Sequence, residues 1–598
     1  MKGKVRNFLA VLGAAAMLLA SCGSANTPTA ATTPATQAPT KTGAPSGVPM
    51  STQTVAQTPK YGGTLTVWHG ASDPSGFDPY KVMDLLCTSI FLSNDELLQG
   101  DWTKGPAGSK EIDWLLGNEG RVDVLAGALA ESWDVPDNQT ITFHIRKGVR
   151  WVNKEPANGR EFTAEDAAWN MNKMWEFPMS THYSGTPPEQ RLISAKALDK
   201  YTFQLKVPPD TIGLHLIMDG ERCHMMCPDV VQKYGDLTDW KKSIGTGPFM
   251  LTDFVSGSSL TYVRNPNHWR TDPIGSGKGN QLPYLDGIKA LIIADASTRL
   301  AAFRTGKVDM NNALWEDANE LTRANPKLEK QQTFAMAYFP TARQDKPELP
   351  FDDVKVRQAM NLAVNKVEIA KSYYQGNAEV MGWPFYPCAT HKYLYTPLDQ
   401  MPADVQEIVK GGNADKAKQL LKDAGYPNGF KTNIVCTSDQ VDLLSIVREQ
   451  LLSVNIDMEI RVLEAGVFRS VNRGRSHEQM IMKEPKMAAN VFRMHEVRKE
   501  SFDNLSFYDN PKMRAVYNEM NKYLGRDDMK WQAMIKAEVP FMIQECVMGI
   551  WLPVPYAYNM WQPWIKNYYG CSDIGFFTPT EAAWYAWIDQ DLKKSMGH

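Results

Sequence analysis

The segment of the sequence with the most chemical potential is 223–227, which reads Cys-His-Met-Met-Cys. Thiolate and imidazole groups are good ligands for copper and zinc, so one interpretation is a metal site. The segment lacks the paired spacing of a zinc module, and adjacent side chains of a regular element rarely face one ion. The other interpretation is a set of buried or paired cysteines, and on this basis we predict no metal.

Signatures of catalysis are missing from the sequence. It contains no nucleophile elbow, phosphate-binding loop, zinc-protease helix or dinucleotide fingerprint in the required context. Carboxylates are plentiful, yet the sequence alone places no two of them the ~5 to 10 Å apart that paired acid and base catalysis needs. We therefore predict no catalytic residues, no cofactor and no enzymatic activity.

Length and charge bound the class of protein. A chain of 598 residues is too long for one core, and ~150 residues per domain suggests roughly three to four domains. The formal net charge of −3 gives no basic excess, so nucleic acid is not a predicted partner. The 17 Trp and 22 Tyr residues fit either large cores or an apolar cleft that stacks on a ligand.

The N-terminus has the pattern of an export signal. Three basic residues within the first six precede the apolar run 8–20, which is too short to span a bilayer permanently. The run ends in Leu19-Ala20-Ser21-Cys22, which resembles a bacterial lipobox. We predict a signal peptide over 1–21 and lipidation of Cys22, which would anchor the protein to a membrane. The alternative is an ordinary secretory cleavage site.

A tether is predicted to follow the signal. Residues 22–60 are rich in Thr, Pro and Ala and poor in charged residues, so they cannot bury enough surface to fold. An extended Pro-rich chain gains ~3.1 Å per residue, which gives this segment a reach of roughly 100 Å.

The first half of the folded sequence, from Tyr61, is predicted to be rich in strands. Thr163 is expected to cap a helix, with Asp166 completing a variant of the capping box. Gly245 and Gly247 are expected to allow positive φ or a close backbone approach, and Ser256-Gly257 separates the strands of a hairpin. The predicted strands, which alternate apolar and polar residues, are 64–67, 129–133, 140–146, 201–207 and the two strands of the hairpin within 243–269.

The second half is predicted to alternate strands with helices, after a unit that begins with a strand at 287–293. In that unit Ser297 is expected to cap a helix that continues to Arg304, followed by a strand at 308–310. The apolar positions predicted to face inward on the next helix are Val356, Met360, Ala363, Val364 and Val367. A helix capped by Asn413 and ended by Gly425 precedes a strand, helix and strand at 431–436, 441–452 and 456–462.

Several ordered motifs between about Tyr61 and Tyr508 together resemble one family. The block Gly245-Thr246-Gly247-Pro248-Phe249 followed by Arg264-Asn265-Pro266-Asn267-His268-Trp269 is similar to its "GTGPY … RNP.YW" pattern. Residues 129–133, 140–150 and 163–166 are similar to its "LAesW … tFhLRkGVkF … TAeDV" pattern, with a longer loop at 153–160. The family is that of the bacterial extracellular solute-binding proteins, family 5, which serve peptide and nickel ABC importers.

The resemblance implies an α/β fold of the periplasmic-binding-protein type II, with two discontinuous α/β lobes and a β-rich extra domain. The implied domains are lobe I from 61–91, 236–334 and 547–598, the β-rich domain II from 92–235, and lobe III from 335–546.

The resemblance also implies a function. The protein would be the substrate-binding subunit of an ABC importer, which captures an oligopeptide or related organic solute between its lobes. Its expected partners are an ABC permease with its ATPase, and it is expected to be an exported, membrane-anchored monomer facing the periplasm or the cell exterior. The alternative is a binder of a metal chelate of the nickel or haem type.

The resemblance guides the choice of ligand contacts. Peptide-binding members carry an Asp that grips the ligand's α-amino group, and the comparable segment here, 480–495, has none. Arg493 and His495 within it favour an anionic or hydrogen-bonding ligand, unless they are solvated surface charges. His69, Trp102 and Trp383 are the other predicted contacts, and the alternative for each is a position in the core.

Overall fold

The computed structural model describes residues 57–82, 87–117, 121–335, 337–483, 497–499, 501, 504–575 and 582–598. The chain divides into two units, 1–44 and 45–598, and all described residues belong to the second. The predicted signal peptide and Cys22 lie outside the described residues.

The last four residues of the predicted tether, 57–60, contact the folded part. The Lys60 ammonium lies 2.7 Å from a carboxylate oxygen of Asp591 and 3.3 Å from one of Asp589, and Ser276 donates a hydrogen bond to the Gln57 carbonyl. Residues 57–60 therefore lie against the folded part, because polar partners far along the sequence hold them there.

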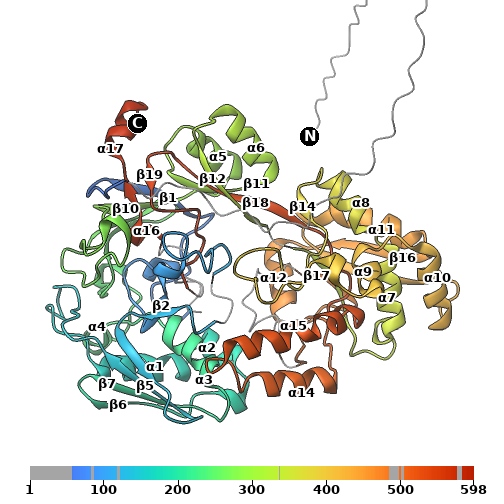
Figure 1. Ribbon diagram of the computed structural model, residues 1–598, viewed down its shortest axis with the longest axis horizontal. Coiled ribbons are helices and arrows are strands. Elements are labelled where there is room, and N and C mark those ends of the chain that lie inside the picture. Colours follow the sequence, from blue (N-terminus) through green and yellow to red (C-terminus); the bar gives the residue numbers. More distant parts are fainter. Residues whose placement is uncertain are drawn as a thin grey trace, which may run out of the picture. The chain divides into compact units, whose positions relative to one another are not determined.

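An eight-stranded mixed sheet contains the first strand of the fold (Figure 1). Its order is β12-β18-β11-β1-β10-β9-β8, and β14 adds to β18. β1 is parallel to both β10 and β11, whereas β9 and β18 run antiparallel to their neighbours. The strands are β1 (Thr64–Gly70), β8 (Phe249–Val255), β9 (Ser259–Arg264), β10 (Gly287–Ile292), β11 (Met310–Leu314), β12 (Glu329–Phe334), β14 (Ala378–Glu379) and β18 (Val554–Trp561).

The predicted hairpin within 243–269 is confirmed as β8 and β9, which pair antiparallel around Gly257 at φ +68°. Gly245 serves a close approach and not a positive φ. A Cβ atom there would lie 1.8 Å from the Ser93 carbonyl oxygen, so no larger residue fits without displacing backbone.

Two details of the next unit differ from the prediction. Helix α5 (Ala296–Arg304) is capped by Asp295, whose carboxylate accepts from the Thr298 N–H, and not by Ser297. Asp and Ser are equally good caps, so a one-residue offset is hard to resolve from sequence. Strand β11 begins at Met310, because the Asp309 amide and carboxylate instead bind the Thr66 backbone of β1.

Residues between Ala130 and Lys206 form a four-stranded, all-antiparallel sheet of order β4-β5-β7-β6. Ile141, Phe143 and Ile145 on one face of β5 are buried, as their alternation predicts. Helix α1 packs on this sheet and begins with the predicted capping box of Thr163 and Asp166. The strands and helices of this region are β4 (Ala130–Asp134), β5 (Thr140–Ile145), β6 (Ser194–Asp199), β7 (Thr202–Lys206), α1 (Ala164–Glu176), α2 (Thr181–Gly185), α3 (Ile212–His215) and α4 (Pro228–Tyr234).

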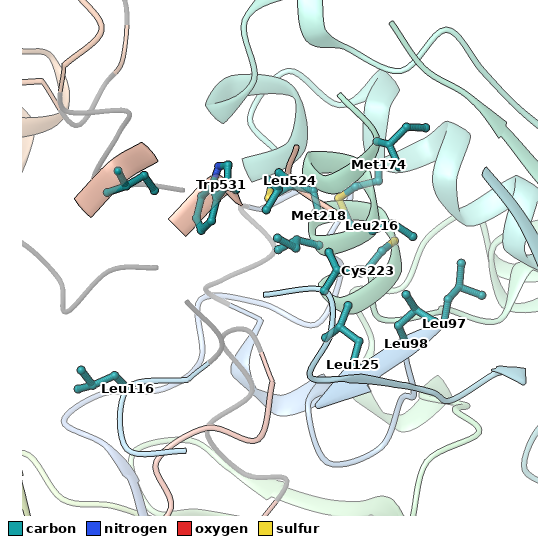
Figure 2. Packing of buried hydrophobic residues seen from close by; sticks show 14 of the residues in the cluster. Leu97, Leu98, Leu116, Leu125, Met174, Leu216, Met218, Cys223, Leu524 and Trp531 are labelled. Atoms are coloured by element: carbon teal, nitrogen blue, oxygen red, sulfur yellow. The ribbon is translucent and has the colours of Figure 1, made fainter. Parts of the chain in front are cut away.

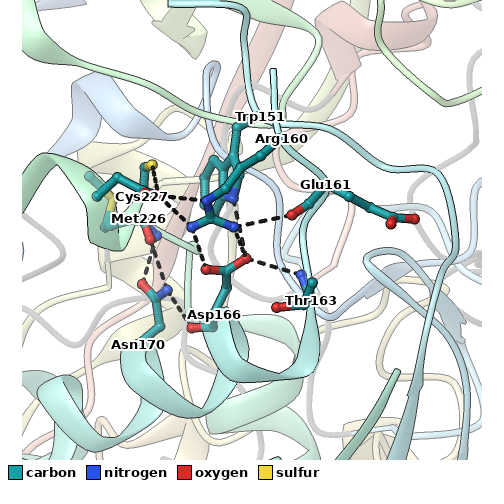
Figure 3. Close-up of polar contacts among 9 residues, drawn as sticks. Trp151, Arg160, Glu161, Thr163, Asp166, Asn170, Met226 and Cys227 are labelled. Carbon is teal, nitrogen blue, oxygen red and sulfur yellow. Dashed lines mark hydrogen bonds and ion pairs between the residues drawn. The ribbon is translucent and has the colours of Figure 1, made fainter. Parts of the chain in front are cut away.

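Figure 3 shows the polar contacts that fix the start of α1. The guanidinium of Arg160 binds both carboxylate oxygens of Asp166, at 2.7 and 2.8 Å, and its Nε donates to Asp229 at 2.7 Å. Asn170, one turn into the helix, donates to the Met226 carbonyl. These bonds join the helix to the segment that contains Cys227.

The segment 223–227 is buried. Figure 2 shows Cys223 in a hydrophobic cluster that also includes Met174, Leu216 and Met218. Cys227 donates to the Asp229 carboxylate, and burial raises the pKa of its thiol to about 12. Among the described residues, no three His, Cys, Asp or Glu side chains are grouped to hold a metal ion.

A second, mixed four-stranded sheet, β13-β17-β15-β16, carries the strand, helix and strand predicted for 431–462. The prediction that Val367 faces inward is wrong. This residue is 45% exposed because α7 ends at Ala363 and the chain turns at Asn365, which caps the next short helix. The elements are β13 (Phe339–Ala342), β15 (Phe430–Cys436), β16 (Ile456–Val462), β17 (Met480–Lys483), α7 (Val354–Ala363), α8 (Lys366–Glu368), α9 (Ala403–Lys410), α10 (Ala414–Asp423), α11 (Val441–Leu452) and α12 (Ala465–Arg473).

The remaining elements complete the two α/β regions or connect them. None of the described helices is long and apolar enough to cross a membrane. The division into lobe I, domain II and lobe III stays a prediction. The remaining elements are β2 (Leu98–Gly100), β3 (Leu125–Gly127), α6 (Trp315–Ala324), α14 (Pro511–Met520), α15 (Asp528–Gln544), β19 (Ile565–Lys566), α16 (Ala582–Tyr585), β20 (Trp587–Ile588) and α17 (Gln590–Ser595).

Candidate functional site

The carboxyl ends of parallel strands are the usual ligand-binding edge of an α/β sheet. The eight-stranded sheet offers such ends at β1, β10 and β11, and the mixed four-stranded sheet offers them at β15, β16 and β17. The chain passes from one sheet to the other between β12 and β13, so the candidate site is the region where these two sets of ends are connected.

His69 stands out at the carboxyl end of β1. The register of β1 against β10 shifts between Trp68 and Gly70, so His69 is the extra residue of a β-bulge. Bulges often re-aim a side chain beside a functional site. The ring of His69 is half-buried, and its Nε2 atom lies 3.2 Å from the Thr88 hydroxyl oxygen. Burial lowers the pKa of His69, which favours a neutral imidazole that can both donate and accept.

Two antiparallel segments connect the sheets, and we call them the junction (residues 334–335 and 337–340, with 549–556). Phe334 is in register with Tyr556, and the Ala335 amide donates to the Pro555 carbonyl at 2.9 Å. Further along, the Ile550 amide donates to the Pro340 carbonyl at 3.1 Å. In Figure 1, β18 is a strand of the eight-stranded sheet, and its first residues pair with β14 beside this junction.

Aromatic rings and one carboxyl group line the junction. The Phe334 ring lies 4.8 Å from that of Tyr386 and 5.9 Å from that of Tyr556, between ring centroids. Glu379 on β14 is hydrogen-bonded to Tyr556, and burial raises the pKa of this carboxyl. Neither Glu379 nor Tyr556 belongs to a recognisable motif, so neither could be predicted from sequence.

The two predicted tryptophan contacts are enclosed by other rings. Trp383 is 1% exposed and stacks on Trp551, with centroids 5.6 Å apart and planes 3° apart. Trp102 is also 1% exposed and stacks on Tyr585 at 4.7 Å, with planes 9° apart. A ligand could reach either ring only if its neighbours moved, so the structure brings neither into an open site with His69.

Arg493 and His495 lie outside the described residues, in the segment that follows β17. The last described residue of that strand, Lys483, is buried and is in register with Phe339 at the start of β13. The strand β17 thus ends beside the junction, and the roles of Arg493 and His495 stay a prediction.

Carboxylates also connect the first half of the chain to the second. Asp113 accepts hydrogen bonds from the Ala389 amide at 2.8 Å and from the Thr390 hydroxyl at 2.7 Å. Asp528, at the start of α15, accepts from the amides of Val122 and Asp123. The two halves of the chain therefore make direct polar contacts at both positions. Both contacts are non-local and were missed from sequence.

Comparison with solved structures identifies the fold. The chain matches the periplasmic binding protein DppA from Helicobacter pylori, in complex with the peptide STSA, with a TM-score of 0.65 and 22% identity. The match covers 89% of this chain and 99% of that one. The fold is that of the type II periplasmic binding proteins.

The family follows from the sequence model that the chain matches. Residues 124–483, more than half of the chain, match the model described as bacterial extracellular solute-binding proteins, family 5. The chain belongs to this family.

Two curated relatives cover part of the chain. Heme-binding protein A of Haemophilus influenzae is 31% identical over 326 residues, which are 51% of this chain and 55% of the relative. Glutathione-binding protein GsiB of Escherichia coli K12 is 24% identical over 364 residues, 59% of this chain and 64% of the relative. The chain thus spans between half and two thirds of the length of these relatives.

Proposed function

We propose that the chain is the substrate-binding subunit of an ABC importer, which binds an oligopeptide or a related organic solute at the junction between its α/β sheets. Two observations together support the proposal. The chain belongs to the family, and the two segments of the junction lie beside the carboxyl ends of both sets of parallel strands. The protein acts by binding and release, without catalysis, and its partners are a permease and its ATPase.

The mechanism is a shift between open and closed arrangements. A ligand that contacts both sheets stabilises the closed arrangement by its differential affinity for the two states. Motion of one sheet against the other requires backbone rotation in a few residues only, and the junction supplies them. The permease would then recognise the closed form.

Binding of a metal chelate of the haem type is the second candidate, and the name of one relative, heme-binding protein A, favours it. Native mass spectrometry of the protein purified from its host separates the two candidates. A retained peptide or small organic mass supports the first, and a porphyrin or metal-chelate mass overturns it.

His69 gives a test at residue level. We expect His69→Ala to weaken binding of the ligand so identified by about two- to tenfold, because one hydrogen bond contributes about 0.5–1.5 kcal/mol net. Isothermal titration calorimetry measures the affinity. His144→Ala on β5 is the matched control. An equal loss of affinity in both variants would show that His69 does not contact the ligand.

We also propose that the protein is an exported lipoprotein attached through Cys22, and that it is a monomer. Cys22→Ala should move the protein from the membrane fraction to the soluble fraction, because the acyl chains are lost. A variant that stays with the membrane would refute the lipid anchor. Light scattering of the soluble variant tests the monomer.

A further inference from the structure

Four buried polar residues gather around Trp269. Asp95, Thr246, His268 and Arg270 are 0%, 1%, 3% and 6% exposed. They come from three segments: the one before β2, the one before β8, and the one after β9. Residues this polar are buried only where they have partners.

Part of this cluster is satisfied within the protein. The Trp269 indole N–H donates to Asp95 Oδ2 at 3.1 Å. His268 Nδ1 lies 3.2 Å from the Thr246 carbonyl oxygen, so Nδ1 is the nitrogen that carries the proton. Burial lowers the pKa of His268 to about 4, which keeps the ring neutral near pH 7 and leaves Nε2 as an acceptor.

Five atoms of the cluster have no hydrogen-bond partner in the described part of the chain. They are Asp95 Oδ1, Thr246 Oγ1, His268 Nε2, and Nε and Nη2 of Arg270. Arg270 Nη2 is 3.8 Å from Asp95 Oδ1, which is too long for a direct hydrogen bond. The guanidinium is held in place by the rings of Trp269 and Trp584, at 4.4 and 4.9 Å.

The unsatisfied atoms include both donors and acceptors. Arg270 offers two N–H groups, whereas Asp95 Oδ1 and His268 Nε2 offer lone pairs, and the Thr246 hydroxyl can do either. An anion would face the lone pairs of Asp95 and His268. A cation would face Arg270 and also Arg146, whose guanidinium lies 4.6 Å from the Trp269 ring. A small neutral molecule that both donates and accepts can bond both partners across the 3.8 Å between Asp95 Oδ1 and Arg270 Nη2.

We propose that a buried water site bridges Asp95 and Arg270, with Thr246 and His268 completing the hydrogen bonds of the bound water. A polar pair separated by more than about 3.5 Å is the usual setting for a bridging water. Two to four polar partners are what an internal water requires. The site ties the segment before β2 to the two segments that flank the β8–β9 hairpin.

A crystal structure of the full chain tests the site directly. We expect a water oxygen within about 2.7–3.2 Å of Asp95 Oδ1 and of Arg270 Nη2. A direct Asp95–Arg270 hydrogen bond with no density between the residues would overturn the proposal. A bromide soak distinguishes an anion, because an anomalous peak at Arg270 would assign the site to an anion instead of water.

Solution measurements give an independent readout. Water oxygen-17 relaxation dispersion should show fewer long-lived internal waters in Arg270→Met than in the native chain. Arg160→Met is the matched control, because Arg160 bonds its carboxylates directly. Thr246→Val, a smaller change, replaces Arg270→Met if circular dichroism shows that the latter is unfolded. An unchanged number of long-lived waters in the folded variant would refute the site.

Discussion

Lys366 is the most unusual single residue in the second half of the chain. It is 1% exposed, and its ammonium donates to the carbonyls of Asn361 and Ile408, at 3.0 Å for the latter. These carbonyls belong to the last turns of α7 and α9. Burial lowers the pKa of Lys366 to about 7. A cation near two helix C-termini is favourable, but its removal from water is costly.

This burial predicts a pH dependence of stability. The unfolded chain holds the Lys366 proton up to pH ~10.4, whereas the folded chain releases it near pH 7. Between these values the unfolded state binds more protons, so stability rises with pH, by at most about 1.4 kcal/mol per pH unit. Urea unfolding between pH 6 and pH 9 measures the rise.

Lys366→Met should remove that rise, whereas Lys371→Met, on the exposed side of the next turn, should leave it unchanged. If both variants follow the pH dependence of the native chain, Lys366 does not titrate in this range.

Arg160 gives a second prediction at the scale of a residue. Arg160→Met leaves the buried carboxylate of Asp166 without its two bonds from the guanidinium. Removal of one partner from a buried pair costs about 3–5 kcal/mol, and the partial exposure of Arg160 lowers this to about 2–3 kcal/mol. Chemical denaturation measures the loss. Arg150→Met, which removes an exposed bond to a carbonyl, should cost less than about 1 kcal/mol. Equal losses would contradict the prediction.

At the scale of elements, the loop that holds Asp113 is tied to the segment after Cys388. Asp113→Asn keeps the size of the side chain but replaces one acceptor oxygen by an NH₂ group. An NH₂ group accepts no hydrogen bond, so the variant side chain can accept from the Ala389 amide or from the Thr390 hydroxyl but not from both. We expect faster amide hydrogen exchange in 389–391 and no change in β15. Equal exchange rates in the variant and the native chain at 389–391 would show that the contact is not needed.

Regular elements were predicted best where the pattern is local. The alternation in 140–146, the capping box at Thr163 and the parallel unit of 431–462 could be read from neighbouring residues. The bulge at His69 and the partners of Asp113 and Asp528 could not, because they depend on residues tens to hundreds of positions away. The stacking partners of Trp102 and Trp383 could not be predicted either, because a sequence does not show which other ring will cover an aromatic side chain.

At the scale of the whole molecule, the junction and the two carboxylate contacts join the halves of the chain in different ways. The junction is covalent and persists in every arrangement, whereas the contacts of Asp113 and Asp528 can break. We expect Asp113→Ala combined with Asp528→Ala to favour an open arrangement, seen as a larger radius of gyration in small-angle scattering without ligand. Addition of the ligand should restore the native value. A native radius in the ligand-free double variant would show that other contacts hold the closed form.

The ion pairs of Lys60 with Asp589 and Asp591 place the entry of the chain beside its final helix. Directly after this point the chain becomes β1, which is bonded along its length to β10 and is also paired with β11. A pulling force applied through the residues before Lys60 therefore acts along the axis of β1 and loads its hydrogen bonds to β10 together, in shear. The eight-stranded sheet would bear that load first, and the load would reach the mixed four-stranded sheet only through the junction.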